Sequence, residues 1–154
     1  MNRWVLAFVC AVVGCGPAGA SAKRGPAQAE ATVRAALAQW PADFAAKRTA
    51  AVCGLFAPDV VLSYPATVDR DFDTICAHFG ALFATDDRTF SYAAPVIEDV
   101  VADNDTVVVR LIWTLTVLDA SGTALEIVQE QGIDVFRRQP DGSWKIRISH
   151  AYPL

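Results

Sequence analysis

The chain has 154 residues, of which 53% are hydrophobic, and it carries a formal net charge of −4. This length supplies one well-buried core and is too short for two ordinary domains. The chain is acidic and contains no run of Lys or Arg interleaved with aromatic residues. It therefore lacks the positive surface that nucleic acid requires, and we expect no nucleic-acid partner.

Residues 1–22 have the pattern of a secretory signal peptide. Arg3 precedes an apolar run over residues 4–13, and the Ala-Ser-Ala sequence at 20–22 forms a cleavage site. The run is far shorter than the roughly 20 residues that span a bilayer. Residues 12–15 read Val-Val-Gly-Cys and also resemble a lipobox, in which Cys15 would be lipidated. We predict an exported protein, periplasmic or secreted, with a lipid on Cys15 as its only membrane attachment if the second cleavage is used.

Residues 23–28 are predicted to be a linker and residues 29–154 the folded domain. Cys53 and Cys76 then remain as an even number of cysteines in an oxidising compartment, and we predict a disulfide between them. The alternative is two buried thiols that pack as small hydrophobic groups. The spacing of these cysteines matches no zinc pattern and the chain has only two His, so we predict no metal site and no cofactor.

The first predicted elements of the domain are helices. An apolar stripe predicts a helix from its i, i+4, i+7 and i+11 spacing, formed by Val33, Leu37, Trp40 and Phe44. The pattern resumes after Pro41 and ends at Pro58, so residues 28–57 are predicted to form one kinked helix or two abutting helices. A short strand over residues 60–64 follows. A further helix carries the apolar stripe from Phe72 to Phe83, with Asp69 or Asp71 as its cap.

The period changes from 3.6 to 2 near residue 89. Turn signals at residues 103–105, 120–122 and 140–142 divide the rest of the chain into four strands, which such short turns make antiparallel. The sequence therefore predicts an α+β domain, with N-terminal helices packed in the concave face of a curved four- to five-stranded antiparallel sheet.

The last hairpin carries most of the chemical information in the chain. If Gly142 takes the positive-φ position of a three-residue loop, residues 139 and 143 pair. This register makes Asp134 face Ile148 and His150 face Gly132, on a side of the hairpin that is otherwise apolar. An Asp and a His on such a face are either functional or structurally satisfied, and we take both as candidate catalytic residues.

The alternatives for these residues stay open at this point. Asp134 could instead be a hydrogen-bonded structural carboxylate, or a wrong register could leave it in solvent. His150 could be a satisfied group at the rim of the sheet. Glu130 is harder to place, because Gly132 is a candidate β-bulge that would reverse the facing of everything before it.

Three stretches together resemble a known family. Residues 54–61 (Gly-Leu-Phe-Ala-Pro-Asp-Val-Val) resemble the helix-to-strand junction of ketosteroid isomerases and SnoaL-like polyketide cyclases. Residues 133–146 resemble the closing hairpin of the same nuclear-transport-factor-2-like superfamily, and residues 148–152 resemble its last strand. The likeness spans residues 30–152 and implies a cone-shaped, cystatin-like roll.

The resemblance also implies roles for three positions. Asp134 falls on the oxyanion-hole Asp of ketosteroid isomerase, which stays neutral in an apolar site and donates a hydrogen bond to the substrate oxygen. The general-base Asp of the family falls on Tyr64, and its oxyanion-hole Tyr falls near Trp40. Since a Tyr cannot take up a carbon-bound proton at neutral pH without a large pKa shift, we do not expect ketosteroid isomerisation itself.

Our functional prediction is a pocket that binds a small, mostly apolar molecule. The expected ligand-binding residues, besides the two catalytic candidates, are Trp40, Tyr64, Phe79, Phe83, Tyr92, Glu130 and Trp144. One alternative is an isomerase, cyclase or lyase with a substituted base. Another is a non-catalytic association module that forms a homodimer through an outer patch made of Leu125, Ile127, Ile133 and Val135.

Overall fold

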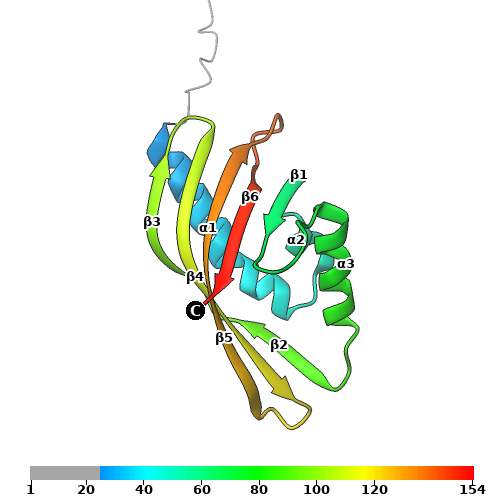
Figure 1. Cartoon of the computed structure of the whole chain (residues 1–154). Helices are drawn as coiled ribbons and strands as arrows, with labels where there is room; N and C mark the ends of the chain where they lie inside the picture. The colour runs from blue at the N-terminus through cyan, green and yellow to red at the C-terminus, as the bar shows by residue number, and fades with distance from the viewer. Residues whose placement is uncertain (1–24) are drawn as a thin grey trace, which may run out of the picture.

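The computed structural model describes residues 25–154 and shows three helices and six strands in this range. The predicted signal peptide and Cys15 lie outside the described residues. The helices are α1 (Pro26–Ala45), α2 (Thr49–Cys53) and α3 (Phe72–Phe83). The strands are β1 (Phe56–Ser63), β2 (Arg88–Tyr92), β3 (Val96–Ala102), β4 (Thr106–Asp119), β5 (Ala124–Arg138) and β6 (Trp144–Pro153) (Figure 1). No helix within residues 25–154 is long and apolar enough to cross a membrane.

Helix α1 confirms the predicted apolar stripe, because all four of its members are buried. The helix begins at Pro26 and therefore includes the last three residues of the predicted linker. Proline fits this first turn, because its missing N–H would have no partner within the helix there. The chain does not break at Pro41, which stays inside α1. It breaks at the turn before α2, where Lys47 has a φ of 53°.

Strand β1 begins at Phe56, four residues earlier than predicted. Pro58 therefore lies within a strand instead of ending a helix. The sheet tolerates it because β1 is an edge strand, where a missing N–H need not break a ladder on both sides. Helix α3 begins at Asp71, one of the two predicted caps, whose carboxylate accepts a hydrogen bond from the Thr74 amide at 2.9 Å.

The strands form one mixed sheet in the order β1-β6-β5-β4-β2, and β3 pairs with the first half of β4 beside β2. The predicted α+β fold class is confirmed, with two differences in detail. The sheet has six strands, because the segment after α3 is divided at residues 93–95, and β1 runs parallel to β6. All three predicted turns join strands, with Gly122 and Gly142 at φ values of 84° and 85°.

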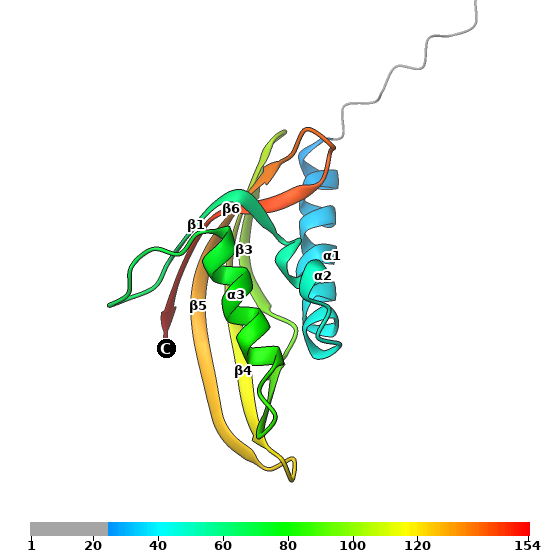
Figure 2. The same ribbon diagram turned by 90° about the vertical axis from the view of Figure 1, so that its right-hand side faces the viewer.

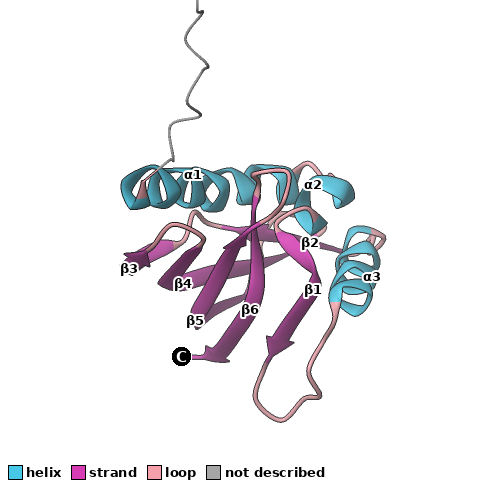
Figure 3. Cartoon of the chain, turned by 90° about the horizontal axis from the view of Figure 1, so that it is seen from above, coloured by secondary structure: helices cyan, strands magenta, loops and turns pink. Residues whose placement is uncertain are grey.

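All three helices lie on one side of the strongly curled sheet (Figures 2 and 3). The core lies between α1 and the inner face of β4 to β6, where Val107, Val109, Leu111, Phe136 and Ile146 are buried. No described helix covers the opposite, outer face of the sheet. The fold therefore has one enclosed side, and a site for small molecules has to be sought there.

Candidate functional site

A cavity of about 110 Å³ lies between α1, α3 and the inner face of the sheet, and we call it the inner compartment. Its volume is several times the space of roughly 10–15 Å³ that one water needs. Its walls are mostly apolar or aromatic, formed by Trp40, Leu55, Phe56, Leu62, Phe79, Tyr92, Trp113, Ile146 and Ala151. Its polar groups are Glu130, Asp134 and Ser149.

A second cavity of about 360 Å³ adjoins the first, and we call it the outer compartment. The two adjoin each other, because they share five wall residues: Leu62, Phe79, Tyr92, Glu130 and Ala151. The outer compartment adds three polar side chains, those of Tyr64, Arg70 and His78. Together the compartments form an apolar pocket that becomes more polar toward its outer part.

Aromatic rings from α1 and from the sheet pack against one another in the wall of the inner compartment. The Trp40 ring lies 5.1 Å from the ring of Tyr92 and 5.2 Å from that of Trp113, measured between centroids. The indole N–H of Trp40 donates to the Val52 carbonyl at 3.1 Å, so it is already satisfied inside the protein. Trp40 therefore offers the cavity an apolar surface and no free donor.

The register of the β5–β6 hairpin differs from the predicted one. The predicted pairing holds from the turn to Phe136 and Ile146, and a β-bulge at Arg147 then shifts every later pair by one residue. Asp134 consequently faces Ser149, not Ile148, and His150 faces Ile133. The bulge leaves the inward direction of Asp134 unchanged but turns His150 to the outer face of the sheet.

Asp134 is the most deeply buried carboxyl group that lines the cavity, with a relative exposure of 4%. Burial disfavours the charged form and raises its pKa to about 6, while the Ser149 hydroxyl favours the ionised form and acts in the opposite direction. Among the described residues Asp134 forms no ion pair. The carboxyl group therefore gains or loses its proton near neutral pH, inside an apolar cavity.

Two tyrosines and a glutamate surround the junction of the compartments. Burial, followed by the charge of Glu130, raises the pKa of Tyr92 well above its ordinary value. The pKa of Tyr64 is raised as well, by burial first, then by the charge of Glu130 and a hydrogen bond to it. Both phenols stay neutral at physiological pH and can donate or accept hydrogen bonds, whereas neither is suited to act as a base.

Three predicted site residues lie away from both compartments. His150 is exposed on the outer face. Trp144 lines surface hollows beside α1, and Phe83 packs against Phe44 with 4.9 Å between ring centroids, next to a separate hollow. The other predicted residues line the cavity: Trp40, Tyr64, Phe79, Tyr92, Glu130 and Asp134.

Sequence reasoning missed six polar or aromatic lining residues: Phe56, Arg70, His78, Phe90, Trp113 and Ser149. Trp113 was detectable, because it shares the inner face of β4 with Val109 and Leu111. His78 also carried a signal, since it lies one residue before Phe79 on α3 and lines the outer compartment beside it. Ser149 carried none, because only the bulge brings it inward.

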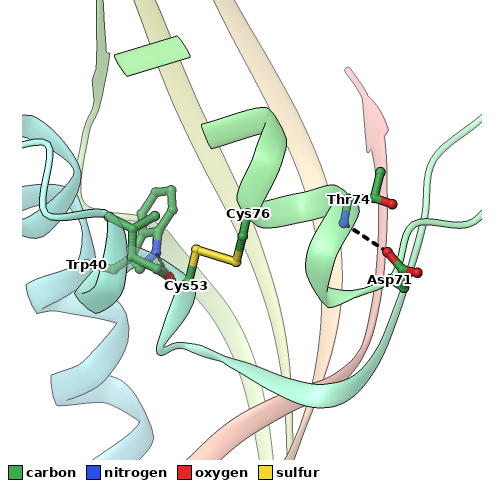
Figure 4. The surroundings of a disulfide bond; sticks show 6 residues. Trp40, Cys53, Asp71, Thr74 and Cys76 are labelled. Carbon is green, nitrogen blue, oxygen red and sulfur yellow. Dashed lines mark hydrogen bonds between the residues drawn. A yellow bond between two sulfur atoms is a disulfide. The ribbon is translucent and has the colours of Figure 1, made fainter. Parts of the chain in front are cut away.

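Cys53 and Cys76 form the predicted disulfide between α2 and α3, with their Cα atoms 5.7 Å apart (Figure 4). Trp40 lies close to this bridge, held by Val52, the neighbour of Cys53. Phe79, one helical turn after Cys76, is part of the cavity wall. The disulfide therefore links two elements that position aromatic walls of the cavity.

Helices packed against a curled sheet over an apolar, acid-containing cavity define the class of cone-shaped α+β domains. The model of the SnoaL-like domain matches residues 33–146. The chain belongs to this family, within the nuclear-transport-factor-2-like superfamily. No curated protein sequence matches the chain.

Several solved structures share the fold. A conserved protein from Planctomyces limnophilus superposes with a TM-score of 0.70 at 16% identity, covering 82% of this chain and 96% of that one. A ketosteroid isomerase-like protein from Erwinia carotovora atroseptica gives a TM-score of 0.62 at 21% identity, with 80% and 95% covered. An NTF2-like protein with a cystatin-like fold from Novosphingobium aromaticivorans gives 0.62 at 17% identity, with 81% of each chain covered. At these identities the likeness establishes the fold alone.

Proposed function

We propose that the domain binds a small, mostly apolar molecule in the inner compartment, with an oxygen atom of that molecule against Asp134. The observation that carries the proposal is the placement of one buried carboxyl group, with no ion-pair partner among the described residues, in a cavity whose walls are mostly aromatic and aliphatic. When neutral, this group can donate a hydrogen bond to a carbonyl, enol or phenol oxygen. The same arrangement in ketosteroid isomerase, to which the fold is similar, stabilises a substrate oxygen.

The raised pKa of Asp134 makes such binding pH-dependent. A ligand that accepts a hydrogen bond binds the neutral form, so its affinity is highest below about pH 6. Above that value the neutral fraction falls about tenfold per pH unit, and the apparent dissociation constant rises by the same factor. Asn at this position presents an amide donor at every pH, and its binding profile loses this dependence.

Isothermal titration with 4-propylphenol between pH 5 and 8 tests the proposal, because this probe has an apolar body and one oxygen. The wild type is expected to lose affinity above pH 6 and to take up a proton on binding, whereas Asp134→Asn binds independently of pH. Native mass spectrometry of the mature domain provides a second readout, through a co-purified molecule. Absence of binding, or identical profiles for the two proteins, contradicts the proposal.

One observation favours turnover as a second candidate function. Glu130 and Asp134 lie on the same face of β5, about 13 Å apart along the strand at its usual rise per residue, and both line the inner compartment. A base and an acid at the two ends of one substrate would support an isomerase- or lyase-like reaction. Glu130 would then replace the base that the family has at the position of Tyr64.

Another observation favours association through the outer face. Five β-branched residues form a row across this face, one on each of five neighbouring strands: Val61, Ile148, Val135, Val108 and Val101. Ile133, two residues before Val135 on β5, is exposed beside this row at 44%, and Ile127, further along the same strand, is exposed at 66%. Contiguous apolar area of this kind is typical of an interaction surface. We propose that two copies of the chain associate through this face to form a homodimer.

We also propose export of the protein. The disulfide supports it, since such bonds persist in oxidising compartments. The intact mass of the protein extracted from its native host distinguishes cleavage after Ala22 from lipidation of Cys15. A mass that includes residues 1–22 without lipid contradicts both.

A further inference from the structure

Arg70 occupies an unusual position at the outer part of the cavity. It precedes α3 in the loop after β1, and its backbone is fixed by two hydrogen bonds to Leu62, at 2.9 and 3.0 Å. Its side chain is partly buried and lines the outer compartment. The backbone of Arg70 is therefore held in place, and its side chain forms part of the wall of the outer compartment.

The charge of Arg70 has no partner in the described protein. Within residues 25–154, its guanidinium forms no ion pair and no side-chain hydrogen bond. Its charge nevertheless reaches groups on two elements: it lowers the pKa of His78 on α3, after burial, and opposes the rise in the pKa of Tyr64 at the end of β1. A partly buried cation without a counter-charge is costly, and an anion from outside the protein would offset that cost.

The acidic groups of the cavity are two carboxyl groups on β5. Asp134 is in the inner compartment, and Glu130 is at the junction of the two compartments. A carboxylate on Glu130 repels an anion at the junction, whereas Arg70 attracts one in the outer compartment. The cavity thus has a positive group in the outer compartment and acidic groups in the inner compartment and at the junction. This arrangement favours a ligand with an uncharged oxygen at one end, near Asp134, and a negative charge at the other end, near Arg70.

We propose that the outer compartment is a carboxylate-binding subsite, in which Arg70 pairs with the anionic end of an amphipathic acid whose apolar body lies in the inner compartment. This inference rests on the ligand-binding function proposed above and names the chemical class of the ligand. The guanidinium suits the task, because its planar fork of N–H donors matches the two oxygens of a carboxylate. The competing account is that Arg70 only balances the charge of Glu130 across Tyr64.

The two accounts differ in how they treat an acid and its uncharged analogue. The probes are 3-(4-hydroxyphenyl)propanoate and 3-(4-hydroxyphenyl)propanamide, which share a phenol end and differ in charge. At pH 6 the wild type is expected to bind the acid about tenfold or more tightly than the amide, the strength of a charge-assisted hydrogen bond. Raising the salt concentration from 20 mM to 500 mM should weaken binding of the acid more than that of the amide.

Arg70→Gln is expected to remove the preference for the acid, because it weakens binding of the acid far more than binding of the amide. Arg70→Lys keeps the charge and should retain part of the preference, which shows that loss in the Gln variant is not a folding defect. Arg137→Gln is the matched control, because it removes the same charge from an exposed site on β5 outside both compartments.

Four results separate the proposals. A preference for the acid that requires Arg70 supports the inference. Equal binding of acid and amide to the wild type overturns it, while the ligand-binding function stands. Binding of 4-propylphenol with no binding of either longer probe also overturns it, because the outer compartment then accepts no extension of the ligand. If 4-propylphenol does not bind either, the proposed function fails and the inference fails with it.

Discussion

Replacement of Asp134 by Asn should change how the stability of the domain depends on pH. The pKa of this carboxyl group is raised to about 6 in the folded protein, whereas in the unfolded chain it is about 3.9. The neutral form is thus favoured by folding. The neutral carboxyl group of Asp134 contributes fully to the free energy of unfolding below about pH 4. This contribution is lost as the pH rises to about 6, because the unfolded chain ionises first and the folded protein must then ionise the group in an apolar cavity.

The difference of about two pKa units corresponds to about 3 kcal/mol, at about 1.4 kcal/mol per unit. Urea denaturation of wild type and Asp134→Asn at intervals from pH 3.5 to 8 isolates this group, since Asn has nearly the same shape and does not titrate. The wild type should lose about 3 kcal/mol relative to the variant between pH 4 and 6 and stay constant above. A relative gain over that interval would refute the reasoning and identify Asp134 as an ion-paired structural carboxylate.

Ser149→Ala provides an internal check on the same measurement. The Ser149 hydroxyl favours the ionised form of Asp134, so its removal should raise the pKa further and move the end of the transition to higher pH. A transition that moves to lower pH, or does not move, would show that Ser149 has no influence on this carboxyl group.

Three further predictions follow from other parts of the molecule. Thiol labelling of the unreduced mature protein should detect neither Cys53 nor Cys76, and reactive thiols would contradict the disulfide. Reduction of a disulfide that closes a loop of this length should lower the free energy of unfolding by about 3 kcal/mol. A standard steroid enone precursor should not be isomerised appreciably, because the family's base position carries Tyr64; turnover that Glu130→Gln abolishes would instead assign the base to Glu130. Ile133→Asp on the outer face should shift the sedimentation of the domain from dimer to monomer, and a monomeric wild type would refute the proposed interface.

The periodicity of the sequence was sufficient to predict most of the fold. The helical stripe of α1 depends on 3.6-residue spacing, and the short turns depend on turn-forming residues, with glycine at positive φ in two of the three. These rules operate within a few residues. Pro58 was misassigned for the opposite reason. Proline ends a helix and also fits an edge strand, and the choice depends on β6, which is distant in the sequence.

The candidate site was predictable only in part, because a single bulge decides which residues face the cavity. Ile146 and Ile148 suggest uninterrupted alternation, and nothing in the residue types marks Arg147 as the extra residue. The bulge brings Ser149 and Ala151 inward, where an unbroken strand would have placed Ile148 and His150. Small side chains at these positions leave room for the cavity, so the error in register was also an error about the space available for a ligand.

The parallel pairing of β1 with β6 has a consequence for the order in which the domain can fold. β1 precedes α3 in the chain, yet among the strands of residues 25–154 it pairs only with β6. During synthesis β1 therefore remains without a partner until β6 has left the ribosome, whereas the hairpins of β4, β5 and β6 involve near neighbours in sequence. Long-range pairing of this kind is slow to form, because the intervening chain must first be ordered. The inner compartment, which takes walls from both strands, is consequently completed only after β6 has paired with β1, and a chain in which this pairing has not formed would be unable to bind ligand.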